Sequence, residues 1–387
     1  MNSIKAFEQS FAHYFNDSSA SAFWKGRVAM YAILKGLGVK DGDEVILPGY
    51  TCVMDVNPIK YLGAKPVYVD IEPNTFNINP ALLESKITPK TTIIVAQHTY
   101  GYPCDMDVIM SIAAKRGITV IEDCCLSFGS TYKGKLVGTF GKATYFSFQW
   151  NKPFTTGLGG MAITNDAELA AKIKNLCDSD LCMPSNKEVA MLAAQLAVYR
   201  MFIYPRTTAL AQNMFRYLTK KGAVVGSSSA AEYNPHMAAD FFKGMSAIQA
   251  RSGIRQLAKV ESNIAHRRQM AELYDTLLKE KGWPTRQYDR SIMDPVMVRY
   301  PVRIKEKNKA LEEAAAAGVE LGSWFECPLH PIETPMDAYD YKIGLCPHAE
   351  KASQEVVNLP LHPRVNEKTV RRTIDFITRF AQAKGSV

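Results

Sequence analysis

The chain has 387 residues, of which 47% are hydrophobic and 22% are charged, and its formal net charge is +8. That length can bury a large core, so we expect one large domain and a smaller one, with the composition of a soluble globular enzyme. The positive charge includes no dense Lys/Arg block, which argues against nucleic-acid binding and leaves room for anionic ligands.

The eight cysteines show neither Cys-x-x-Cys pairs nor the spacing of a metal finger. Residues 1–15 lack the basic start and apolar core of a secretion signal. We therefore expect reduced thiols, a cytoplasmic protein and no metal site.

Residues 5–37 predict helices, because apolar residues recur at helical spacing after residue 27. A helix that begins at Gly26 and Arg27 would offer free backbone N–H groups and the positive end of its dipole to a phosphate. Arg27 could add a salt bridge to that phosphate, or it could be a solvated surface arginine. Both readings remain open at this point.

Four β-branched runs follow, separated by segments long enough for helices; they occupy residues 44–48, 66–70, 92–98 and 118–123. Continuous Val/Ile runs are typical of parallel strands that are buried on both faces. Their alternation with helices predicts an α/β fold with a mostly parallel sheet flanked by helices. His98 ends the third run, and we favour a hydrogen-bonded histidine of the sheet over a polar contact at the edge of the site.

Two groups with chemistry follow strand ends. Asp123 closes the run at 118–123, and Lys152 follows another apolar run at 144–148. Ligands of open α/β sheets bind beyond the carboxyl ends of the strands. A lysine amine can form an imine with pyridoxal phosphate, and a carboxylate can keep the ring nitrogen of that cofactor protonated. Taken alone, an Asp and a Lys are weak evidence, so the surrounding residues decide.

Those surrounding residues resemble one family. After Glu122-Asp123 come small residues, then G-x-x-Y-K-G-K-x-V-G-T-F-G, Ser147-Phe148, the lysine and T-T-G-x-G-G. This pattern is similar to the DegT/StrS-type sugar aminotransferases, and phrases such as GDEVILPGYT extend the resemblance over nearly the whole chain outside 185–235. The resemblance implies an aspartate aminotransferase-like fold (fold type I), pyridoxal phosphate as cofactor and a homodimer with shared active sites.

The resemblance also implies roles for single residues. Lys152 would be the catalytic residue, which holds the cofactor and shuttles a proton. Asp123 would bind the ring nitrogen, and Ser147 with the helix start at Gly26 would bind the phosphate.

Four positions depart from the family pattern. Arg27 stands where relatives carry a threonine, Cys52 at or near the aromatic residue that stacks on the ring, and Leu126 where a Gln or His contacts the ring hydroxyl. The asparagine that crosses the dimer to the phosphate aligns with Phe242, and its neighbour Lys243 could replace it as a point charge.

We expect a cofactor-binding domain at 1–240, a helical insertion in it at 185–235, a linker helix at 241–284 and a small α/β domain at 285–387. The basic and aromatic residues of 189–225 would suit a membrane surface, but packing on the dimer or over the site is favoured. In the small domain the sequence predicts strands at 296–304 and 319–325 and helices at 308–318 and 367–382. The resemblance would place Trp324, Phe325 and His330 near the substrate entrance.

The predicted reaction moves an amino group from an amino-acid donor, first of all L-glutamate, to a keto group of a sugar, nucleotide-linked in most relatives. The partners would be these two small molecules and a second copy of the chain. Two alternatives remain open. One is a pyridoxal phosphate enzyme of other chemistry or with a non-sugar substrate, and the other is a weakly catalytic homologue with a membrane-surface or regulatory role.

Overall fold

The computed structural model describes residues 2–150, 152–199, 230–285 and 288–381. Within these residues the largest sheet has seven strands in the order β1-β10-β9-β6-β5-β2-β4. β10 runs antiparallel to both of its neighbours, and the other adjacent pairs are parallel. The strands of this sheet are β1 (Ser19–Phe23), β2 (Glu44–Pro48), β4 (Lys65–Val69), β5 (Thr91–Gln97), β6 (Thr119–Asp123), β9 (Ala143–Ser147) and β10 (Gly160–Thr164).

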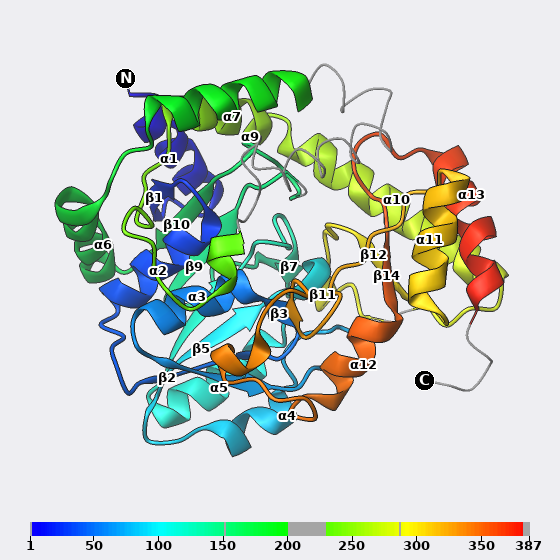
Figure 1. Ribbon diagram of the computed structural model, residues 1–387, viewed down its shortest axis with the longest axis horizontal. Helices are drawn as coiled ribbons and strands as arrows, with labels where there is room; N and C mark the ends of the chain where they lie inside the picture. Colours follow the sequence, from blue (N-terminus) through cyan, green and yellow to red (C-terminus); the bar gives the residue numbers. More distant parts are fainter. Residues whose placement is uncertain (1, 151, 200–229, 286–287, 382–387) are drawn as a thin grey trace.

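Helices cover the sheet and build the C-terminal part of the chain (Figure 1). The α-helices of the described residues are α1 (Ser3–Tyr14), α2 (Gly26–Gly36), α3 (Val53–Tyr61), α4 (Pro80–Leu83), α5 (Met106–Arg116), α6 (Ala167–Asp180), α7 (Asn186–Val198), α9 (Ala247–Leu257), α10 (Val260–Glu280), α11 (Lys307–Ala317), α12 (Pro347–Glu355) and α13 (Glu367–Ile377).

The predicted α/β fold with a mostly parallel sheet is confirmed, and β2, β4, β5 and β6 lie within one residue of the predicted runs. The N-terminal prediction is wrong at one place. Residues 5–37 were expected to be helical, but β1 lies between α1 and α2. Its sequence, SASAF, carries no β-branched residue, and its strand conformation comes from antiparallel pairing with β10 at the edge of the sheet.

Successive side chains of each strand enter two different apolar cores. On β5, Ile93 belongs to the core beneath α2 and α3, whereas Ile94 belongs to the core beneath α1 and α5. This division follows from the period of two in a β-strand, where neighbouring side chains point to opposite faces. Both cores consist of buried side chains, so the sheet is buried on both faces as its sequence predicts.

The same alternation separates the two acids at the end of β6. Asp123 lies on the face of Ile121, towards α2 and α3, and Glu122 lies on the opposite face with Val120. Glu122 is fully buried and accepts hydrogen bonds from the backbone N–H groups of three residues of the following loop, Gly138 (2.7 Å), Phe140 (2.8 Å) and Gly141 (2.7 Å). Glu122 therefore fixes the loop that leads into β9.

His98 completes this cluster. Its Nδ1 accepts a hydrogen bond from the N–H of Cys104 (3.0 Å), so Nε2 carries the proton and faces Glu122 Oε2 at 3.1 Å. The Cys124 sulfur lies close enough for a joint metal site. The ring nitrogens and both carboxylate oxygens are already engaged in hydrogen bonds, which gives the cluster a structural role and agrees with our interpretation of His98.

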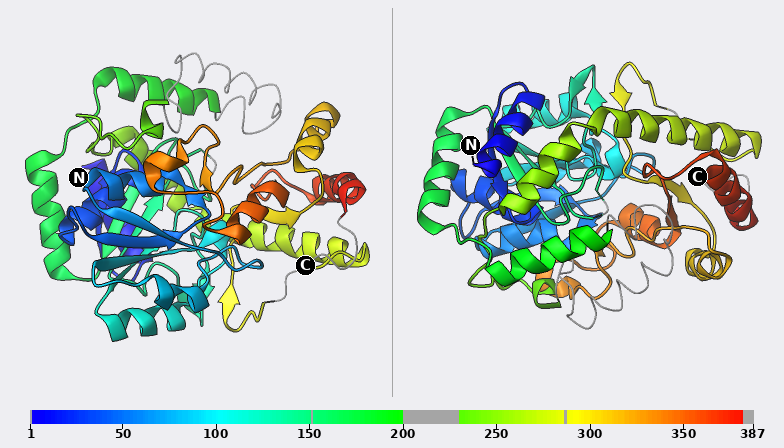
Figure 2. Two further views of the ribbon diagram at one scale, coloured as in Figure 1. Left: turned by 60° about the horizontal axis from the view of Figure 1, so that its bottom comes forward. Right: turned by 90° about the horizontal axis from the view of Figure 1, so that it is seen from above.

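The C-terminal part lies beside the sheet, and α10 reaches from one to the other (Figures 1 and 2). Its two-stranded sheet pairs β12 (Tyr300–Arg303) with β14 (Val356–Leu359), and α13 packs along α10. The helices expected at 308–318 and 367–382 appear as α11 and α13. The segment expected to be one linker helix, 241–284, contains α9 and α10.

The strand expected at 319–325 is absent from the described structure. Gly322 alone makes a backbone bridge, to Asn358, and the chain then turns away. The carbonyl of Trp324 accepts a hydrogen bond from the Tyr100 hydroxyl, and the N–H of Phe325 donates one to the Tyr50 hydroxyl (3.3 Å). These contacts replace strand pairing, because they fix the segment against the large sheet.

The expected insertion at 185–235 begins with α7, whose N-terminus carries a capping box of Ser185 and Glu188. Residues 200–229, which hold most of the stretch considered for membrane contact, lie outside the described residues. Of the helices that the structure describes, none has the length and apolarity needed to cross a bilayer.

Glu122→Gln tests the structural role of this acid. The amide would turn one acceptor oxygen into a donor that faces backbone N–H groups, so we expect the free energy of unfolding to fall by about 1–3 kcal/mol in urea denaturation. Glu168→Gln is the matched control, because Glu168 is exposed and pairs with Lys172 on the surface of α6. Equal stability of the two variants would contradict the role.

Candidate active site

The start of α2 lies against the end of β9. A Cβ atom added to Gly26 would lie 2.8 Å from the Cβ of Ser147 and 3.1 Å from the carbonyl oxygen of Phe146. Because that space is filled, only glycine allows the helix to begin here. The N-cap residue, Lys25, makes no side-chain capping bond, so backbone N–H groups of the first turn are left to face a ligand beside Ser147.

Two cations flank this helix start. Arg27 Nη1 lies 2.7 Å and Lys25 Nζ lies 2.9 Å from Glu232 Oε1. Arg27 is buried, which excludes the reading of it as a solvated surface residue. Burial and the neighbouring Arg27 charge lower the pKa of Lys25 to about 8. Both cations therefore meet the Glu232 carboxylate beside the start of α2.

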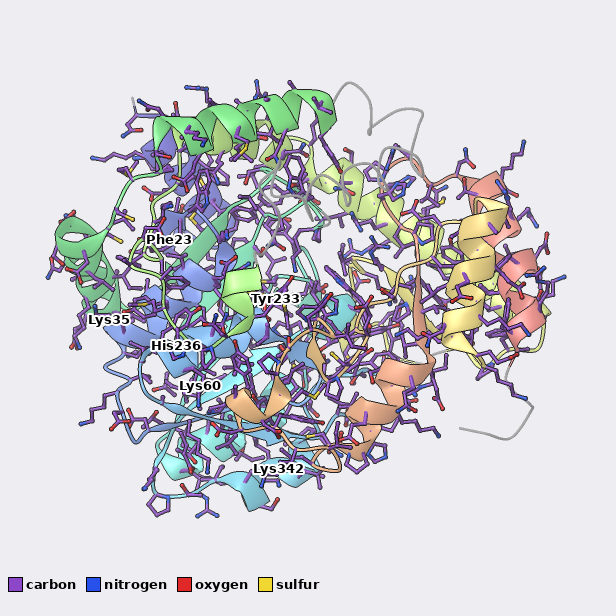
Figure 3. The ribbon with its side chains drawn as sticks, in the orientation of Figure 1. Phe23, Lys35, Lys60, Tyr233, His236 and Lys342 are labelled. Carbon is purple, nitrogen blue, oxygen red and sulfur yellow. The ribbon has the colours of Figure 1, made fainter. Side chains whose placement is uncertain are left out.

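Glu232 comes from η4 (Ala230–Tyr233), a short 3₁₀ helix that follows the undescribed segment. Its backbone carbonyl accepts a hydrogen bond from Asn57 Nδ2 on α3 at 2.8 Å. Figure 3 shows Tyr233, the last residue of η4, beside α2 and α3. The contacts of Glu232 thus place η4 at the edge of the anion-binding helix start.

Asp123 lies on the same face of the sheet as this helix start. It is buried, and its Oδ1 accepts a hydrogen bond from the N–H of Cys125 at 2.8 Å. The register of β6 with β9 pairs Asp123 with Tyr145, whose fully buried side chain lies beside the Asp123 carboxylate. Asp123 is therefore a fixed carboxylate at the carboxyl end of a central strand.

Lys152 reaches the same place from the turn after β9. Its backbone N–H donates to the carbonyl of Gln149 (3.0 Å), and its Nζ lies 5.2 Å from the centre of the Trp324 ring. An ammonium group is attracted to the face of an indole ring at such a distance. The charges of Lys152 and Asp123 both act on one neighbouring carboxyl group, that of Asp55, so both members of the sequence-predicted pair lie near Asp55.

Asp55 is a site residue that the sequence reasoning missed. It lies in the first turn of α3, with Oδ1 3.3 Å from the Tyr145 hydroxyl and Oδ2 3.4 Å from Thr51 Oγ1. Burial, followed by the repulsion of Asp123, raises the pKa of Asp55 well above its usual range, and Lys152 opposes that shift. The available signal was a lone carboxylate in the apolar run VMDVNPI.

A C-terminal segment closes the site. β13 (Leu329–His330) pairs in parallel with β3 (Thr51–Cys52), which sets His330 opposite Cys52 and holds Trp324 over Lys152. Burial lowers the pKa of His330 and raises that of Cys52 to about 12, so both side chains are neutral. Of the residues expected near the entrance, Trp324 and His330 therefore lie near Lys152, and Phe325 packs against His330.

The remaining predicted residues have other surroundings. Leu126 is buried in the apolar core on the Asp123 face and offers no polar contact. Lys243 Nζ lies 2.6 Å from Glu188 Oε1 and 2.7 Å from Asp240 Oδ2, so within one chain it is neutralised by two carboxylates. Phe242 packs against Phe23 and Tyr31. This segment lies near Lys25, whose pKa the Lys243 charge lowers, rather than beside Asp123.

The donor set fits pyridoxal phosphate. The cradle at Gly26 and Ser147 with the adjoining Arg27 suits a phosphate, because backbone N–H groups, a hydroxyl and a guanidinium converge there. Asp123 suits a protonated ring nitrogen, and the primary amine of Lys152 suits an aldehyde.

The family model described as the DegT/DnrJ/EryC1/StrS aminotransferase family matches residues 2–378. GDP-perosamine synthase from Escherichia coli O157:H7 is 32% identical over 384 residues, which cover 99% of this chain and 91% of that protein. UDP-2-acetamido-2-deoxy-3-oxo-D-glucuronate aminotransferase from Pseudomonas aeruginosa is 33% identical over 347 residues (89% and 82%). The solved structure of ntda from Bacillus subtilis with bound cofactor PMP superimposes with a TM-score of 0.73 at 25% identity, covering 97% of this chain and 76% of that one.

Glu232→Gln should strengthen the binding of inorganic phosphate to the cofactor-free protein, because it removes a carboxylate that competes for Arg27 and Lys25. The expected gain is on the order of 1 kcal/mol, read as a larger rise of the unfolding temperature with added phosphate. Glu168→Gln should respond like the wild type. An unchanged phosphate response in Glu232→Gln would show that the anion does not bind between these cations.

Proposed function

Because the chain belongs to the DegT/DnrJ/EryC1/StrS aminotransferase family, whose members use pyridoxal phosphate, we propose that it transfers the amino group of L-glutamate to the keto group of a nucleotide-linked sugar. The observation that supports this proposal is that Lys152 and Asp123, which follow the ends of β9 and β6, both lie near Asp55 and shift its pKa in opposite directions. The start of α2 at Gly26, where the phosphate would bind, packs against the end of β9.

The sugar and its nucleotide are supported by relatives and by charge. Two relatives that each cover most of the chain are named for GDP-linked and UDP-linked sugar products or substrates. A net charge of +8 favours the approach of a diphosphate-bearing acceptor. Arg299 lies near the entrance, with its Cζ 5.9 Å from the centre of the Trp324 ring, where a guanidinium could meet a phosphate.

Each side chain has a defined task in this proposal. Pyridoxal phosphate, when bound, supplies an electron sink for the negative charge that develops at the donor α-carbon. Lys152 Nζ would hold the cofactor through its aldehyde, and as a free amine it would serve as the base and acid that moves the α-proton of the donor. Asp123 accepts the hydrogen bond of the ring nitrogen and so keeps that nitrogen protonated.

Other groups bind and shield. Ser147, the backbone N–H groups that begin at Gly26, and Arg27 hold the phosphate. Trp324 lies over Lys152 and stabilises its ammonium form when the amine carries a proton. The neutral Cys52 and the apolar Leu126 replace polar or aromatic contacts, which is why a non-sugar acceptor stays the second candidate.

We also propose a homodimer with shared sites. The segment at Phe242 and Lys243 is the one that sequence resemblance assigns to the partner's cofactor. In a single chain, Glu188 and Asp240 hold Lys243. A contact with the partner's phosphate would therefore share or exchange these ion pairs.

Lys152→Ala should abolish covalent trapping of the cofactor. Borohydride reduction of the wild-type protein should attach pyridoxal phosphate to the peptide that contains Lys152, and peptide mass spectrometry would locate the label. Lys142→Ala is the matched control, because Lys142 is exposed and pairs with Asp166. A label on any other lysine would overturn the assignment of Lys152.

The donor half of the reaction should run without any sugar. L-Glutamate alone should bleach the visible band of the lysine-bound cofactor and release 2-oxoglutarate in a single turnover, whereas Lys152→Ala should release none. Addition of keto-sugar nucleotides should then restore the band, and the one that does so identifies the acceptor. No conversion with glutamate, glutamine, aspartate or alanine would exclude an aminotransferase of this kind.

A further inference from the structure

Asp55 is a carboxyl group that the proposed reaction does not use. It is half-buried, and its two oxygens face hydroxyl groups, with Oδ1 3.3 Å from Tyr145 and Oδ2 3.4 Å from Thr51. Both partners are fully buried. The question is which of these three groups carries the hydrogen in each contact.

The hydrogen of Thr51 is already committed. Gln97 Nε2 donates to the Tyr50 carbonyl (3.0 Å) and to Thr99 Oγ1 (2.9 Å), which uses both amide hydrogens. Gln97 Oε1 must therefore accept, and it receives the Thr51 hydroxyl hydrogen at 2.5 Å. Thr51 has no second hydrogen for Asp55. The contact at 3.4 Å is a hydrogen bond only if Asp55 is protonated and donates to Thr51 Oγ1.

Two carboxyl groups can accept the hydrogen of the Tyr145 hydroxyl. The Tyr145 hydroxyl can donate to Asp55 Oδ1 at 3.3 Å, and it also lies beside the Asp123 carboxylate, which helps to raise its pKa. An ionised Asp55 would compete for that single hydrogen and would place a second negative charge next to Asp123. A neutral Asp55 leaves the hydrogen to Asp123, because a carboxylate is the stronger acceptor.

The groups around Asp55 come from every element packed against it. The charged ones are Asp123 on β6, Lys152 after β9 and Arg27 on α2. The titratable neutral ones are Tyr145, Cys52 and Cys125, and burial raises the pKa of each of these three. Burial of Asp55 itself is the largest influence on its pKa, and it favours the neutral acid over the anion despite Lys152 and Arg27.

We propose that Asp55 is a positioning residue that acts as a neutral carboxylic acid: it donates to Thr51 and leaves the Tyr145 hydrogen to Asp123, which orients the Asp123 carboxylate towards the cofactor ring. The effect on the ring rests on the role proposed above for Asp123. Ionisation of Asp55 at alkaline pH would release Tyr145 from Asp123 and weaken the hold on the cofactor.

The state of Asp55 can be read in the cofactor-free protein. The infrared difference spectrum between wild type and Asp55→Asn should contain a protonated carboxyl band at about pH 6 and a carboxylate band at about pH 9. Asp178→Asn, on the exposed surface of α6, is the control and should show a carboxylate at both pH values. A carboxylate difference for Asp55 at about pH 6 would overturn the proposal.

The pH dependence of stability tests the protonation state of Asp55 independently. A folded protein that keeps Asp55 neutral binds a proton that the unfolded chain loses above about pH 4. Its stability therefore falls as pH rises from that point until folded Asp55 ionises. Asp55→Asn should remove this part of the fall in unfolding temperature, whereas Asp178→Asn should retain it.

Cofactor affinity tests the positioning effect. In equilibrium dialysis of the cofactor-free protein with pyridoxal phosphate, wild-type affinity should drop roughly tenfold between about pH 6 and about pH 9. Asp55→Asn, a permanent neutral mimic, should match wild type at the lower pH and change less than wild type at the higher one. Tyr145→Phe should bind weakly at both pH values.

Identical pH profiles of pyridoxal phosphate affinity for wild type and Asp55→Asn would overturn the link from Asp55 to the cofactor. The infrared and stability measurements contain no cofactor, so they decide the state of Asp55 whatever happens at Lys152. Failure of borohydride trapping would overturn the proposed function alone.

Discussion

The site depends on the alternation of side chains along β6. Glu122 and Asp123 are neighbours in sequence, but the pleat sends one to each face of the sheet. The Glu122 carboxylate accepts hydrogen bonds from backbone N–H groups of the loop before β9. That loop leads into β9, which carries Tyr145 and Ser147 on the face of the sheet where Asp123 lies. A buried structural acid therefore supports a buried functional one, and neither could exchange roles without a shift of register.

Burial controls the charges around this strand end. Arg27 and Lys152 are cations whose charges act on the carboxyl group of Asp55, and Asp123 lies near it on the same face of the sheet. The cost of burying a second anion keeps Asp55 neutral, and the nearby cations suit a ligand that carries a phosphate. Glu232 pairs with Lys25 and Arg27 from η4, which couples the segment after residue 229 to the start of α2.

The site is assembled from parts of the chain that are distant in sequence. The pairing of β13 with β3 brings Trp324 and His330 to Lys152, although nearly half of the chain separates them. The Tyr100 hydroxyl donates to this segment and the Tyr50 hydroxyl accepts from it, and these hydrogen bonds hold it in place of the predicted strand. The site is thus closed when the C-terminal part packs against the large sheet, and the two share one apolar core.

The sequence by itself determined the parallel strands, the pair Asp123 and Lys152 that we propose binds the cofactor, and the helix start at Gly26. Each of these is a local pattern: a β-branched run, a motif of fixed spacing, or a glycine where a helix opens. Only the tertiary structure decided that SASAF is an edge strand, that Arg27 is buried against Glu232 and that Asp55 faces Tyr145. Those facts depend on contacts between residues far apart in the chain, and a group's ionisation follows from its solvation and its neighbours, which the order of residues alone does not specify.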